Sequence, residues 1–177
     1  KTDGYIAHSA YAVPSRNVVI ATAEATGQRA VGAHEARPNT REGLQAPMWT
    51  IDISDETQPM EITQLPPPAD VEQACAGLKG RYGAHNIFMN PPVPTAAHLK
   101  RTVVAAMFAA GVRVYSIADP KRPVEIGHFV PDAPATSRMG VIQMNDVYVD
   151  EKKLIYAVDR VSGGLYVLEY TGPTPLD

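Results

Sequence analysis

The sequence predicts an all-β fold built from repeated antiparallel sheets, and three observations point to it. Three segments each contain three strand-like runs separated by turn residues. Residues 53–62 align without a gap on residues 117–126, with Ile, Asp, Pro, Glu and Ile at matching places. The 16 Pro and 13 Gly residues allow many chain reversals. Self-similarity of short strands and turns is typical of a β-propeller, whose blades are sheets of four antiparallel strands.

The strand-like runs define where each blade is expected. They are residues 8–13, 18–24 and 49–55, then 85–90, 103–108 and 112–119, and finally 145–150, 154–159 and 165–170. The expected blades are 4–65, 84–131 and 142–172, with insertions at 26–47, 66–83 and 91–101. About three blades leave the ring incomplete. Residues 1–177 are therefore expected to be the C-terminal part of one propeller domain, with the remaining blades in a missing N-terminal segment or a second chain.

The aligned decapeptide predicts a strand, a turn and an outer strand. Asp55 and Asp119 can accept backbone N–H bonds that start the turn. Pro59 and Pro123 then fix φ at the entry to an outer strand, where a missing donor is tolerated. A second hairpin turn is expected at residues 160–164, where two glycines allow φ > 0.

Composition excludes some classes of partner and leaves the compartment open. The 45% apolar and 20% charged content suits a folded chain. A net charge of -3 argues against a broad nucleic-acid surface, and no apolar run approaches the roughly 20 residues that span a bilayer. Cys75 is the only cysteine, so no disulfide forms within the chain. Both cytoplasmic and periplasmic or secreted locations stay open, because any signal would lie upstream of Lys1.

The second repeat carries a family resemblance. Residues 111–120, with Pro123 and Gly127, resemble the LVIVD repeat, a propeller-blade motif of bacterial proteins. Residues 83–86, 145–150 and 163–166 are similar to the closing blades of that family, which is distantly similar to the selenium-binding protein and methanethiol oxidase group. The resemblance implies metal binding by inner-strand histidines near the axis, and His8 and His85 fall at that position. Cys75 matches no motif of the group, so no catalytic cysteine is expected.

The residues that open the inner strands are the main candidates for chemistry. His8, His85 and Asn145 occupy equivalent places and are expected around one mouth of the central channel. Imidazole suits Cu, Zn or Fe(II) as a ligand and also serves as a general base. The alternative is structural, since polar channel residues often bind water or bridge neighbouring blades. A divalent transition metal held by His8 and His85 is therefore a hypothesis.

Further polar residues fall at matching places beside these. Asn86 and Asp146 come next in their strands. Together with Asn145, they are expected either to bond the local backbone or to orient a metal-binding residue by a hydrogen bond from outside the ligand set. Glu24 and Asp159 end their second strands and are candidates for acid–base or metal work, the alternative being a carboxylate that caps a turn.

The other histidines and the aromatic residues receive structural assignments. His34 with Glu35 lies in the first insertion and His98 in a Pro-rich one, so both are expected at the surface or in a lid. His128 is expected on an outer strand, away from the axis. The expected residues for packing between blades are Trp49, Tyr115 and Tyr166.

Two functions remain open at this point. One is a metal-dependent enzyme that oxidises or hydrolyses a small molecule at the propeller axis through His8 and His85. The other is a non-catalytic propeller that binds a protein or another ligand through its loops. Whether the chain is an enzyme is left open by the sequence.

Overall fold

Antiparallel β-sheets form the whole described fold of this protein. The computed structural model describes residues 6–24, 46–70 and 80–177. The strands are β1 (Ile6–Val13), β2 (Val18–Glu24), β3 (Met48–Asp52), β4 (Met60–Gln64), β5 (Thr102–Ala106), β6 (Val112–Ser116), β7 (Val124–Phe129), β8 (Met144–Val149), β9 (Leu154–Asp159) and β10 (Gly164–Glu169). A 3-10 turn, η1 (Pro14–Arg16), joins β1 to β2. The predicted all-β class is confirmed.

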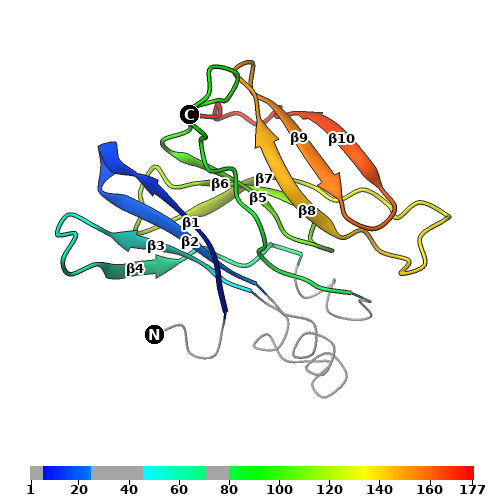
Figure 1. Ribbon diagram of the computed structural model, residues 1–177, viewed down its shortest axis with the longest axis horizontal. Coiled ribbons are helices and arrows are strands. Elements are labelled where there is room, and N and C mark those ends of the chain that lie inside the picture. Colours follow the sequence, from blue (N-terminus) through cyan, green and yellow to red (C-terminus); the bar gives the residue numbers. More distant parts are fainter. Residues whose placement is uncertain (1–5, 25–45, 71–79) are drawn as a thin grey trace.

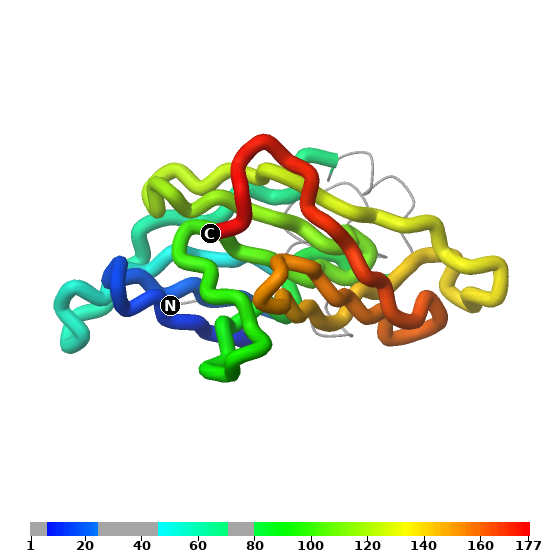
Figure 2. Tube along the Cα trace, turned by 90° about the horizontal axis from the view of Figure 1, so that it is seen from above, coloured from blue at the N-terminus to red at the C-terminus, as the bar shows by residue number. Residues whose placement is uncertain are grey.

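Three sheets follow one another along the chain. They have the strand orders β1-β2-β3-β4, β5-β6-β7 and β8-β9-β10, and all pairings within them are antiparallel. The second sheet lies between the first and the third (Figure 1), and the view from above keeps the same order (Figure 2). None of these sheets closes on itself.

The expectation of four strands in every sheet is met only in the first. In the second sheet, residues 85–88 run along β5, with backbone bonds from His85 N to Ala106 O and from Phe88 N to Val104 O. Their pairing is reduced to an isolated bridge between Ile87 and Ala105, and Pro91 and Pro92 end the extended run. In the third sheet the chain turns away after β10 and buries Leu176 between the second and third sheets.

The aligned decapeptides form the same hairpin in the first two sheets. The Oδ1 atom of Asp55 accepts the Thr57 N–H at 3.0 Å, and that of Asp119 accepts the Lys121 N–H at 3.0 Å. Pairing shifts by one residue at Thr50/Ile51 in the first sheet and at Val114/Tyr115 in the second. The repeated residues therefore determine both the turn and the position of the β-bulge, which is a regular part of the hairpin and not a defect.

Each face of the middle sheet is buried against a different neighbour. Val103, Ala105 and Tyr115 belong to the core shared with the first sheet. The alternate residues Val104 and Val114 belong to the core shared with the third. Because side chains alternate across a strand, this division places the second sheet between two apolar layers.

The third sheet leaves its outward face uncovered within the described part of the chain. Leu165 in the third sheet and Val112 in the second occupy equivalent positions, because each follows the glycine of its hairpin turn. Leu165 pairs with Val158, and Val112 pairs with Ala106. Val112 is 1% exposed, whereas Leu165 is 64% exposed; Val167 is likewise 55% exposed. The third sheet thus presents an apolar face whose equivalent in the second sheet is buried.

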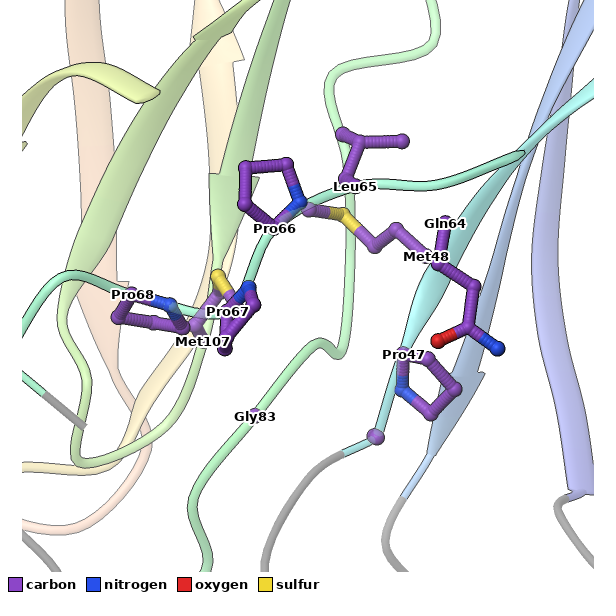
Figure 3. Close-up of a pocket in the computed structure, with 10 residues that line it drawn as sticks. Pro47, Met48, Gln64, Leu65, Pro66, Pro67, Pro68, Gly83 and Met107 are labelled. Carbon is purple, nitrogen blue, oxygen red and sulfur yellow. The ribbon is translucent and has the colours of Figure 1, made fainter. Parts of the chain in front are cut away.

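A proline segment connects the first sheet to the second. Pro66–Pro68 lines a cavity of about 40 Å³ with Met48 and Met107, large enough for one or two water molecules (Figure 3). The segment is held at Asp70, which receives two hydrogen bonds of 2.8 and 2.9 Å from Arg113. The Arg113 side chain is fully buried and also bonds Glu125 and the Ala110 carbonyl.

The insertion at 91–101 packs against the protein body. Leu99 is 2% and Ala97 3% exposed. Asn90 binds both the N–H and the carbonyl of Leu99, and the Ala97 N–H donates to Val149 O. The segment therefore joins the second and third sheets.

Several predictions concern residues outside the described part of the chain. These are His34 and Glu35 in the first insertion, and Cys75 in the second. Over the residues that are described, no helix combines the length and apolar character needed to cross a bilayer.

Candidate metal centre

His8 lies on a bulge at the inner edge of the first sheet. Pairing of β1 with β2 runs from Ala7↔Ala23 directly to Ser9↔Thr22, so His8 is the extra residue. The same irregularity occurs in the third sheet, where Met144↔Asp159 is followed by Asp146↔Val158 and Asn145 is extra. A bulge re-aims a side chain, and the two sheets use it at the matching position.

His85 has the corresponding place beside the second sheet. Its N–H donates to Ala106 O, and the next residue, Asn86, accepts the Ala106 N–H at 2.8 Å. Thr22 on β2 donates its buried hydroxyl to the His85 carbonyl at 3.0 Å and accepts the Ser9 N–H. This hydroxyl bonds the edge of the first sheet to the segment that carries His85. The His8 and His85 rings lie side by side, with centroids 4.5 Å apart and planes tilted by 33°.

Glu24, at the end of β2, brings a carboxylate to the two rings. Its Oε1 lies 3.6 Å from His85 Nε2, and its Oε2 lies 3.9 Å from His8 Nε2. The three donor atoms lie within 4.8 Å of one another. In a tetrahedral site with bonds of 2.0–2.1 Å, donor atoms are about 3.3 Å apart. His8, Glu24 and His85 therefore supply the donor types of a metal site, and their donor atoms would have to move from within 4.8 Å to about 3.3 Å of one another to bind one ion.

Hydrogen bonds orient both imidazoles for binding through Nε2. His85 Nδ1 lies 2.7 Å from the Asn145 carbonyl, which can only accept, so Nδ1 carries the proton and Nε2 keeps its lone pair. His8 Nδ1 lies 2.8 Å from the Ser9 hydroxyl, which in turn donates to Asn86 Oδ1 at 3.4 Å. Both rings thus direct Nε2 toward Glu24. In metal sites, hydrogen-bond partners outside the ligand set orient ligating histidines in the same way.

Burial favours the neutral form of His85. Its side chain is 9% exposed, and this loss of water lowers the pKa of the imidazole below 6.5. The hydrogen bond to Asn145 and the charge of Glu24 oppose the shift, whereas the charges of His8 and Arg160 add to it. A neutral imidazole is the form that binds a metal.

The predicted outer residues divide into two kinds. Asn86 and Asn145 belong to the hydrogen-bond chains of His8 and His85, although Asn145 acts through its backbone. Asp146 instead bonds the N–H of Val147, which agrees with the structural alternative.

Asp159 caps a turn, which is the alternative that the sequence left open for it. Its carboxylate accepts the N–H groups of Gln143, Val161 and Ser162 at 2.7–3.0 Å. Burial would raise the pKa of this carboxyl, but the backbone donors outweigh burial and lower it. Asp159 is not a member of the His8, Glu24 and His85 group, in contrast to Glu24.

Sequence reasoning missed three residues beside this group. Arg81 binds Glu24 Oε1 at 2.5 Å and lies over the Phe108 ring, 5.3 Å from its centroid. Arg160 approaches the same ring at 5.9 Å, and the ring lies 4.6 Å from that of His85. Phe108 adopts a φ of 49°, in the left-handed region that non-glycine residues seldom occupy.

The remaining described histidines lie away from this group. His98 is exposed in the packed 91–101 segment. His128 is exposed on β7 and pairs with Glu125 at 3.4 Å. Both positions agree with their expected surface or structural roles, and the aromatic residues Trp49 and Tyr115 are buried in the core between the first two sheets.

Family models and curated proteins were compared with this chain. No protein-family model matches it, and no curated protein does either. The geometry of His8, Glu24 and His85 is therefore the main guide to function.

Proposed function

We propose that this chain is part of an LVIVD-type β-propeller and that His8, Glu24 and His85 form a metal site at its axis, where a small molecule is oxidised or hydrolysed. One observation carries the proposal: two imidazoles and one carboxylate from separate segments converge within 4.8 Å. Hydrogen bonds at Nδ1 of both imidazoles leave the Nε2 atoms to bind a metal.

Propeller architecture is supported by the matched register of the three sheets. The residues at their inner edges, His8, His85 and Asn145, have equivalent places. The exposed face with Leu165 and Val167 corresponds to a face that the second sheet buries against the third. A further sheet of the same construction would cover it, supplied by the rest of the protein or by a second chain.

The donor set fits a catalytic metal site. Two histidines and one carboxylate leave coordination positions open for water or substrate, as in zinc hydrolases and in non-haem iron oxygenases. When bound, a divalent Cu, Zn or Fe ion would supply a Lewis acid or a redox centre. Arg81 would keep the Glu24 carboxylate in place through Oε1, which leaves Oε2 for the metal.

Calorimetric titration with Zn²⁺, Cu²⁺ and Fe²⁺ tests the proposal. We expect one equivalent to bind, with affinity reduced at least about 100-fold in the variant His8→Asn/His85→Asn, since loss of even an outer partner costs 10- to 100-fold. His98→Asn, which removes an exposed histidine, is the matched control and should bind like the wild type.

Failure to bind any of the three ions, or binding that ignores the double variant, would refute the metal site. The non-catalytic alternative would then be favoured, because the uncovered face of the third sheet suits a protein partner.

A further inference from the structure

Two guanidinium groups share one aromatic ring beside the candidate metal centre. Arg81 and Arg160 lie 5.3 and 5.9 Å from the centroid of Phe108, a ring that is fully buried. Cations over an aromatic face are stabilised by its quadrupole, most strongly when water is excluded. The same ring contacts His85, so both positive charges lie close to the predicted ligands.

Gln143 positions both arginines through the backbone. Its side chain is 2% exposed, and it accepts the Arg81 N–H at 3.0 Å while donating to the Arg81 carbonyl at 3.2 Å. Its own carbonyl accepts the Arg160 N–H at 3.1 Å, and its N–H donates to Asp159. The buried side-chain amide thus bonds two backbone groups of Arg81, and the backbone carbonyl of the same residue holds the Arg160 N–H.

The two arginines differ in their acidic partners. Arg81 is bonded to Glu24. For Arg160, which is exposed, the described residues provide no ion pair, and the adjacent Asp159 directs its carboxylate at backbone donors. The guanidinium of Arg160 therefore keeps its donors for a ligand.

Charge balance gives the class of that ligand. Arg81 and Arg160 balance the charges of Glu24 and Asp159, so a divalent ion bound to neutral imidazoles would leave two positive charges uncompensated. An anion is the natural complement of such a site, and guanidinium matches the planar carboxylate group well.

We infer that the substrate is a small anionic molecule, with a carboxylate or a group of like charge held by Arg160 and its reacting atom directed at His8, Glu24 and His85. The inference deepens the proposed function and rests on it for the reaction. Arg160 would act as a specificity residue, and the Gln143 side chain as a positioning residue for Arg81.

Acetate and its neutral isostere acetamide are suitable probes, with binding followed by NMR shifts of the Arg160 and His85 amides. The titrations are run on the Zn²⁺-loaded and the metal-free protein. We expect acetate to bind and acetamide to bind much more weakly. Arg160→Gln should weaken acetate binding about 3- to 10-fold, the range for one charge-assisted contact at a partly exposed site.

Controls separate this inference from the metal site. Arg122→Gln removes an exposed arginine on the turn between β6 and β7, and acetate binding should not change. Zn²⁺ affinity in Arg160→Gln should stay at the wild-type value.

Acetate affinity that is indifferent to Arg160→Gln, or acetamide binding as tightly as acetate, would overturn the inference even if Zn²⁺ binds. Loss of Zn²⁺ binding with Arg160-dependent acetate binding retained would instead refute the metal site and uphold the anion site.

Discussion

The buried guanidinium of Arg113 should be a main support of the fold around the candidate site. It is fully buried and bonds Glu125 Oε1 at 2.9 Å, both oxygens of Asp70, and the Ala110 carbonyl. Ala110 belongs to the turn that carries Phe108, on which Arg81 and Arg160 lie. Replacing Arg113 by Met keeps an apolar stem of similar length and removes all four hydrogen bonds.

The expected loss of stability follows from what the substitution leaves behind. Removing one partner of a buried ion pair costs about 3–5 kcal/mol, because the other charge stays buried without compensation. The Glu125 side chain is 11% exposed and would keep only the exposed His128 and the Ala69 N–H as partners, whereas Asp70 is 44% exposed and regains water. We therefore expect Arg113→Met to lower the free energy of unfolding by about 3 kcal/mol.

Urea unfolding followed by circular dichroism measures this change. Arg122→Met is the matched control, since that side chain is 86% exposed and pairs with Asp119 at the surface, and its cost should stay below about 0.5 kcal/mol. Adding Glu125→Gln to Arg113→Met should restore part of the stability, because it removes the uncompensated charge. Equal costs for Arg113→Met and Arg122→Met would refute the reasoning.

Two further predictions concern the repeat and the protonation of the site. Val114→Thr should destabilise the protein by about 1–3 kcal/mol, whereas Val167→Thr, at the equivalent exposed position of the third sheet, should stay within about 0.5 kcal/mol. Equal costs of the two substitutions in urea unfolding would contradict the assignment of a buried and an uncovered face. Long-range ¹⁵N NMR spectra should show the proton of His85 on Nδ1. Because the pKa of His85 is lower in the folded than in the unfolded chain, the contribution of His85 to stability is complete above about pH 6.5 and declines as the pH falls below that value. His85→Asn, whose amide can replace the Nδ1 donor, should flatten this decline, and a spectrum with the proton on Nε2 would contradict the assignment.

The repeat made the fold predictable where the same residues recur. Ile53–Ile62 and Ile117–Ile126 share the turn-forming Asp and the Pro before the outer strand, and both hairpins formed with the same bulge. Strand number was less predictable. Pairing beyond β5 depends on Ile87 and its neighbours, which the following prolines restrict to a single bridge.

The site was only partly predictable for a related reason. His8, His85 and Glu24 could be found because they stand at repeated positions. Arg81 could not, since it lies in an insertion that matches no other part of the chain. Arg113 was hidden by the pattern itself, because Arg between two valines suggests an exposed side chain, whereas Asp70 and Glu125 allow it to be buried.

The most direct test of the metal centre is a crystal structure of the Zn²⁺-loaded protein with anomalous diffraction at the zinc edge. We expect one peak about 2.0–2.2 Å from His8 Nε2, His85 Nε2 and Glu24 Oε2, with Arg81 still bonded to Oε1. A peak elsewhere, or coordination through Nδ1 of His85, would contradict the account.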